Sequence, residues 1–139
     1  MTWRTPMITE IRQRGGPKKT LFALLLDLRG LEEGSFGVTD PSWPLQILLM
    51  NRKKGHVVRK HMHKRILKST KQPMEAIVVV RGAIEASIFS RKGELIAKQN
   101  VFAGQCLLIL DGAHEVHVKK DTVMYSFKDG PYIEDKILL

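Results

Sequence analysis

Two histidines one residue apart, His61 and His63, have the spacing of a pair that could share one metal ion. Side chains of a β-strand alternate between its two faces, so residues two apart point the same way, with Cα atoms about 6.8 Å apart. On a helix the same two side chains would point in widely different directions. The pair can therefore bind a cation only if this part of the chain is a strand and further ligands join it.

Candidates for those further ligands lie later in the chain. Glu75 opens an apolar stretch, and a glutamate is seldom buried without a partner. His114 and His117 follow a glycine turn; on a strand they would face opposite sides, so only one can join, and the turn position favours His114. Three histidines and a glutamate suit a divalent transition metal such as Fe, Mn, Ni or Zn. His56, directly after a turn, is expected at the surface.

Three other residues are candidates for binding or catalysis. Arg59 has the same strand parity as His61, and its planar guanidinium suits a carboxylate or phosphate, an internal ion pair being the alternative. Gln46 is a second candidate for the substrate-binding wall. Tyr125 is a candidate proton donor, although a tyrosine in such a strand is more often a packing residue. A small anionic molecule is the expected ligand.

The elements that must position these residues are short. Apolar stretches recur about every ten residues between turn residues, without a long amphipathic helix, which predicts an all-β sandwich or barrel. Strands are expected at 20–28, 45–50, 56–64, 74–80, 83–89, 94–102, 105–110, 116–120 and 122–127, with a basic loop at 65–73. Residues 1–19 are expected to form an irregular or short helical arm, and residues 20–139 a single domain.

Composition narrows the class of protein. The 139 residues contain 23 Lys and Arg against 14 Asp and Glu, a net charge of +9, which points to anionic partners or to a solvated basic surface. Nucleic acid is disfavoured because the chain has no DNA-binding motif and only 6% aromatic residues. The single cysteine, Cys106, lies in an apolar run and is expected to be buried. Without disulfides, a signal peptide or a long apolar run, we expect a cytoplasmic protein that does not contact membranes.

The glycines, histidines and glutamate together form a recognisable order. The chain contains Gly55, five residues, His61 and His63; then Glu75, six residues and Gly82; then Gly104, Gly112 and His114. This order resembles the two motifs of the cupin superfamily, and with its flanking strands the resemblance covers about residues 20–128. The ending DGPYIEDKIL is similar, more loosely, to the end of small single-domain cupins encoded near sugar and surface-polysaccharide genes.

The resemblance implies a fold and a site. The fold would be a cupin-type jelly-roll barrel (a double-stranded β-helix), and the protein a homodimer. A divalent metal would be held by His61, His63, Glu75 and His114. The metal-bound protein would act on a small anionic molecule such as a sugar or nucleotide-sugar, in an isomerase- or epimerase-like reaction of surface-polysaccharide metabolism. Two alternatives remain open: a non-catalytic cupin that binds or senses a small ligand, and a structural or nucleic-acid-interacting protein, suggested only by the charge.

Overall fold

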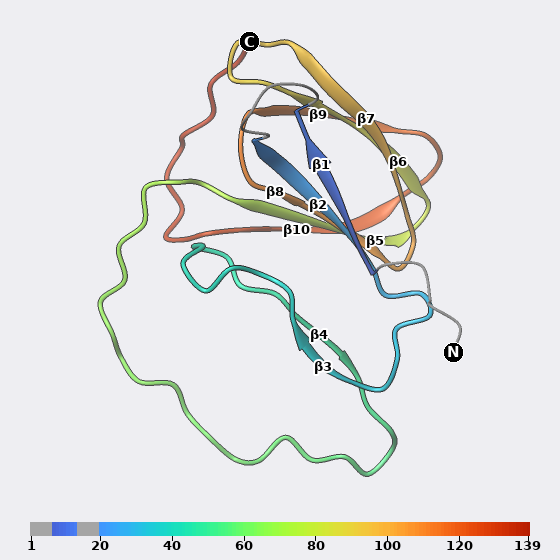
Figure 1. Ribbon diagram of the computed structural model, residues 1–139, viewed down its shortest axis with the longest axis vertical. Coiled ribbons are helices and arrows are strands. Elements are labelled where there is room, and N and C mark those ends of the chain that lie inside the picture. Colours follow the sequence, from blue (N-terminus) through green and yellow to red (C-terminus); the bar gives the residue numbers. More distant parts are fainter. Residues whose placement is uncertain (1–6, 14–19) are drawn as a thin grey trace.

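The computed structural model describes residues 7–13 and 20–139, and all the regular structure in them is β (Figure 1). Its ten strands are β1 (Ile8–Arg12), β2 (Leu21–Asp27), β3 (Gly34–Gly37), β4 (Leu48–Asn51), β5 (Glu75–Arg81), β6 (Ala83–Phe89), β7 (Leu95–Phe102), β8 (Gln105–Ile109), β9 (Ala113–Val118) and β10 (Val123–Lys128). No helix in this part of the chain is long and apolar enough to cross a membrane.

The strands form three antiparallel sheets. The largest has the order β1-β2-β8-β5-β10, the second has the order β7-β6-β9, and the third consists of β3 and β4. Side chains from the two larger sheets share one hydrophobic core, which includes Leu25, Leu107, Ile77 and Ile84. The two sheets therefore face each other as the layers of a sandwich, and the described residues do not close into a barrel.

The central strands β2 and β8 of the five-stranded sheet are buried on both faces. Leu25 and Leu107 face the three-stranded sheet. Their neighbours Leu26 and Leu108 face a second core, which is closed by residues around β3 and β4 such as Leu49. A strand buried on both sides has no polar face, and this explains why β2 and β8 are continuous apolar runs rather than alternating ones.

Two motif glycines have a structural cause. Gly82 and Gly112 adopt φ of 97° and 74°, a left-handed backbone that side chains with a Cβ rarely take. A Cβ at Gly82 would collide with the carbonyl oxygen of Asp121, and one at Gly112 with that of Phe89. These turns start β6 and β9, so glycine at both positions allows the close approach of neighbouring backbone.

Most of the predicted strands are present within a few residues, and the buried Cys106 is confirmed, but two expectations are wrong. Residues 8–12, expected in an irregular or helical arm, form edge strand β1, where Ile11 is buried in the core; the rest of that arm, 1–6 and 14–19, lies outside the described residues. Residues 56–64, expected as a strand, have no regular structure, and every one of them is exposed. Both faces of such a strand would carry basic side chains, so neither gains by packing on the core.

Candidate metal site

Glu75 and His114, which lie on different sheets, contact each other. Glu75 begins β5 on the same face as Ile77, and His114 lies on the same face of β9 as Val116, so both point between the sheets. The distance from Glu75 Oε2 to His114 Nε2 is 3.0 Å, and the two side chains are only 20% and 31% exposed. Two predicted ligands that are 39 positions apart in the sequence are therefore neighbours in the fold.

The carboxylate of Glu75 has a second partner on β10. This strand pairs with β5 so that Lys128 lies opposite Glu75, and the Ser126 hydroxyl donates to Glu75 Oε1 at 2.7 Å. The hydrogen bond from His114 lowers the pKa of Glu75 to about 2, with help from Ser126 and from the charges of His114 and Lys128, and against the effect of burial. Glu75 is thus an ionised, oriented carboxylate at neutral pH.

The start of β5 is fixed by side chains from elsewhere in the chain. Asp129 Oδ1 accepts a hydrogen bond from the Met74 backbone N–H at 2.9 Å, and Met74 itself is buried. The side-chain amide of Gln72 donates to the carbonyl oxygen of Leu110, just before β9. These two contacts place Glu75 beside the turn that leads into His114.

His61 and His63 form a second pair, separate from the first. Their rings lie 5.1 Å apart and nearly perpendicular, at 77°. His61 Nδ1 lies 2.7 Å from the carbonyl oxygen of Arg59, and because a carbonyl can only accept, Nδ1 is the donor in this contact. A metal-ligating histidine commonly donates its other ring N–H in this way. Yet in residues 7–13 and 20–139 no three His, Cys, Asp or Glu side chains form a group that could hold a metal.

The other two histidines lie outside both pairs. His117 contacts Glu115 on the face of β9 opposite His114, which confirms that residues 114 and 117 cannot serve the same site. His56 is exposed, as expected, and its backbone N–H donates to the carbonyl oxygen of Lys53.

The candidates for substrate binding are placed differently from the metal ligands. The amide of Gln46 donates to the carbonyl oxygens of Asp40 and Trp43, at 2.7 and 2.9 Å, so it holds its own loop together. Tyr125 lies opposite Val78 on β5, hence on the face of the sheet away from Glu75. Neither side chain therefore points towards a ligand bound at the Glu75–His114 pair.

The contacts of Tyr125 and Arg59 lie away from Glu75 and His114. Tyr125 stacks on Phe127 at 5.7 Å. Arg59 is exposed beside the histidine pair. Ser126, which sequence reasoning missed, is the polar residue that interrupts the apolar run VMYSF of β10, and that interruption is the signal that could have drawn attention to it.

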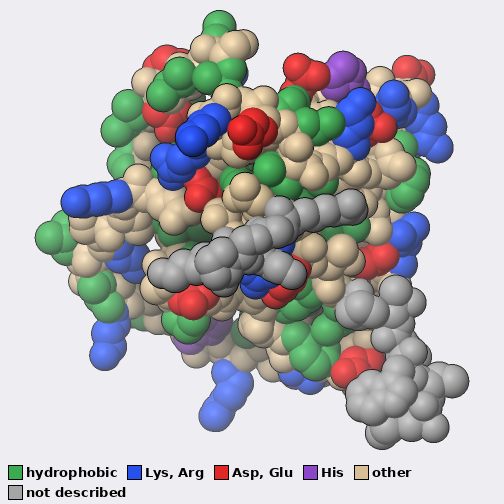
Figure 2. All heavy atoms as spheres, turned by 45° about the horizontal axis from the view of Figure 1, so that its top comes forward, with side chains coloured by type: hydrophobic (Ala, Val, Ile, Leu, Met, Phe, Trp, Pro, Cys, Tyr) green, Lys and Arg blue, Asp and Glu red, His purple; other side chains and the backbone are tan. Residues whose placement is uncertain are grey.

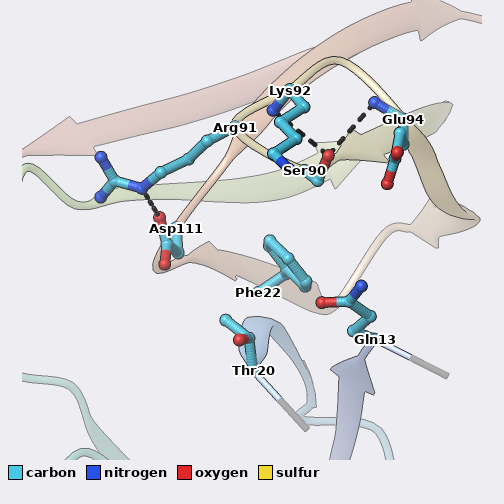
Figure 3. Close-up of a pocket in the computed structure, with 8 residues that line it drawn as sticks. All are labelled: Gln13, Thr20, Phe22, Ser90, Arg91, Lys92, Glu94 and Asp111. Carbon is cyan, nitrogen blue, oxygen red and sulfur yellow. Dashed lines mark hydrogen bonds and ion pairs between the residues drawn. The ribbon is translucent and has the colours of Figure 1, made fainter. Parts of the chain in front are cut away.

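A pocket of about 290 Å³ lies elsewhere in the fold (Figure 3). It is lined by Gln13, Thr20, Phe22, Ser90, Arg91, Lys92, Glu94 and Asp111. Two of its charged side chains pair with each other, since Arg91 Nε lies 2.7 Å from Asp111 Oδ1. None of the predicted site residues contributes to its wall, so we do not assign the candidate site to it.

The four predicted metal ligands thus form two separate pairs, Glu75–His114 between the sheets and His61–His63 on an exposed segment. No protein family, curated protein or solved structure was found to match this chain.

Proposed function

We propose that this protein is a cupin-like jelly roll that binds a divalent transition metal and, through it, a small anionic molecule. The observation that carries the proposal is the contact between Glu75 and His114. Two adjacent ligand atoms on one ion, each bonded at about 2.1 Å, lie about 3 Å apart, and the observed separation is 3.0 Å. Two facing antiparallel sheets are also what a jelly roll requires.

The charge distribution supports an anionic ligand. Residues 52–71, which we name the basic segment, contain nine Lys and Arg and no Asp or Glu. That leaves 14 basic residues in the rest of the chain, equal to its 14 acidic residues, so the whole net charge of +9 belongs to this segment. His61 and His63 lie within it. Two of the four proposed metal ligands therefore lie in the same segment as the surplus cations, and a phosphate-bearing molecule such as a nucleotide-sugar fits both.

A divalent ion at this site would act as a Lewis acid towards an oxygen of the bound molecule. Glu75 would be ready to ligate because it is ionised at neutral pH, and His61 would ligate through Nε2 because its Nδ1 donates to the carbonyl oxygen of Arg59. An isomerase- or epimerase-like reaction on a sugar would also need a proton donor or acceptor. Tyr125 lies on the opposite face of its sheet, and this favours the alternative of a binding or sensor protein.

Metal analysis of the freshly purified full chain tests the proposal. We expect about one equivalent of Fe, Mn, Ni or Zn per chain by inductively coupled plasma mass spectrometry. The double variant His61→Ala/His63→Ala and the single variant Glu75→Gln should each lose most of it, whereas His117→Ala, a matched control on β9, should keep it. A wild-type protein without stoichiometric metal would refute the metal site, as would undiminished metal in both variants.

The anionic ligand is tested by thermal unfolding. A nucleoside diphosphate should raise the Tm in proportion to RT ln(1 + [L]/Kd), and the uncharged nucleoside should not. Arg59→Ala should reduce the rise in Tm. Lys98→Ala is the matched control, because Lys98 is an exposed residue of edge strand β7 outside the basic segment, and it should leave the rise unchanged. Equal shifts with nucleoside and nucleoside diphosphate would contradict recognition through phosphate.

A polyanion is a second candidate ligand, favoured by the same concentration of charge. The basic segment contains no Phe, Tyr or Trp, which single-strand binding by base stacking would need. Titration of an RNA and a DNA duplex at two salt concentrations decides the matter. Affinity that falls steeply with salt and disappears when three lysines of the segment are neutralised would support the polyanion over the small molecule.

A further inference from the structure

The basic segment makes almost no contact with its own chain. Every residue from 52 to 73 is exposed, and Figure 1 shows this part of the trace, in green, looping away from the two sheets. Its ends are held: Arg52 donates to Ser35 Oγ, and Gln72 donates to the carbonyl oxygen of Leu110. Between them, within the described chain, a single backbone hydrogen bond joins His56 to Lys53. An unstructured segment of this length is unusual in a compact domain and commonly has a function.

The two larger sheets are incomplete on the side that carries Glu75 and His114. Strand β9 ends the three-stranded sheet and β10 ends the five-stranded one, and the described residues place no further strand beside either. Both edges are on one side, because residues 119–122 connect them directly and the Glu75–His114 contact spans the sheets there. Such open edges are templates for pairing with another strand.

Side chains on these edges are also left uncovered. Val118 on β9 is 57% exposed, and Val123 and Met124 on β10 are 45% and 40% exposed. Exposed hydrophobic side chains appear among the charged ones on the face drawn in Figure 2 as well. A strand added at these edges would cover apolar surface and would satisfy unpaired backbone groups at the same time.

The basic segment offers what the open side lacks. His61 and His63 already lie together, with their rings 5.1 Å apart, and strand alternation would keep both on one face. His114 is on the inward face of the edge strand β9. A strand paired to β9 with its histidines inward would therefore place both imidazoles beside the Glu75–His114 pair.

We infer that two copies of this chain exchange their basic segments, so that His61 and His63 of one copy complete the Glu75–His114 site of the other. The inference rests on the proposed metal site and adds where its ligands come from. A segment of twenty residues has a contour length of up to about 66 Å, so a loop anchored at both Arg52 and Gln72 can extend about half that distance towards a neighbouring copy. Exchange of an element between identical chains is a low-cost route to a two-fold dimer, and here it would build two metal sites.

Mixed dimers test the exchange. One copy carries His61→Ala/His63→Ala, and the other, with a different tag, carries Glu75→Gln/His114→Ala; the two are co-expressed and the mixed dimer is purified through both tags. Exchange leaves one site with all four ligands, so the mixed dimer should bind about one equivalent of Co²⁺, half the wild-type amount, with the absorption of a ligated ion. If each chain built its own site, the mixed dimer would bind none, and the inference would be overturned.

A crosslink separates this inference from the metal proposal. In a Cys106→Ser background, His63→Cys on one copy and His114→Cys on the other should form a disulfide between differently tagged chains under mild oxidation, with or without metal. His56→Cys in place of His63→Cys should form much less. A disulfide that forms only within a chain carrying both cysteines, or a wild-type protein with the 15.8 kDa mass of a monomer in light scattering, would refute the exchange even if the metal is present.

Discussion

The ionised side chain of Glu75 should stabilise the folded protein, and the effect is open to measurement. The change Glu75→Gln keeps the size of the side chain and its ability to accept from Ser126, but removes the charge that His114 and Lys128 face. The pKa of Glu75 falls from 4.5 to about 2, and each pH unit corresponds to about 1.36 kcal/mol, so the charge contributes at most about 3 kcal/mol. Since water reaches part of both Glu75 and His114, we expect about 1–3 kcal/mol.

The sign of the pH dependence follows from the lowered pKa. The unfolded chain binds a proton at this carboxyl near pH 4.5, while the folded protein does so only near pH 2. The stabilisation by Glu75 is therefore complete above about pH 5 and is lost as the pH falls from there towards 2. Wild type and Glu75→Gln should differ most at pH 5.5 and should converge near pH 2.

Urea unfolding in the presence of a chelator measures this without interference from metal. The free energy of unfolding of both proteins would be determined at half-unit steps between pH 2.5 and 5.5, wherever both remain folded in the absence of urea. Glu85→Gln on β6 is the matched control, because it removes an acidic side chain from the neighbouring sheet and should cost less than 0.5 kcal/mol at every pH. A difference between wild type and Glu75→Gln that stays constant, or grows, as the pH falls would refute the argument.

Three further predictions concern the surroundings of this carboxylate and the core. Ser126→Ala removes one of the two hydrogen bonds to Glu75 and should lower the free energy of unfolding by about 1 kcal/mol in the same urea assay. Gly112→Ala should cost more than 2 kcal/mol of stability because its Cβ would strike backbone, whereas Gly93→Ala, also at positive φ but facing open space, should cost only about 1 kcal/mol. Burial raises the pKa of the Cys106 thiol to about 11, so a disulfide reagent at pH 8 should modify it at least a hundred times more slowly in the native protein than in 6 M guanidinium.

The strands were predictable because their sequence signals are local. Residues 83–89 were expected as a strand, and β6 has those bounds; turn residues on either side and an apolar interior decide such an element. Strand β1 was not predictable in this way. Only Ile11 of its five residues is buried, and the strand exists because its backbone pairs along β2, which is a long-range contact that composition does not reveal.

In the candidate site, too, some features were predictable from the sequence and others required the fold. The pairing of Glu75 with His114 was predictable from the order of the motifs, since each residue opens or follows a strong strand. The environment that sets the pKa of Glu75 was not, because Ser126 and Lys128 reach it through strand register. A shift of one residue along β10 would have turned Tyr125 towards Glu75 and Ser126 away, so which face each side chain occupies required the fold.

The segment around His61 shows the limit of predicting a strand from the alternation of side chains alone. Strand alternation in GHVVRKHMHK groups His61 with His63, and their rings do lie 5.1 Å apart, although residues 56–64 are not a strand. Alternation alone does not make a segment form a strand. A strand gains stability from burying one face or from pairing its backbone, and here the basic side chains on both faces prevent burial of either face. The backbone of this segment can therefore become a strand only where an open edge such as β9 receives it. If it does, the same pairing that orders the strand also delivers two imidazoles to Glu75 and His114. Zn²⁺ should then slow the hydrogen exchange of residues 56–64 further in the wild type, and His61→Ala/His63→Ala should lose this additional protection together with metal binding.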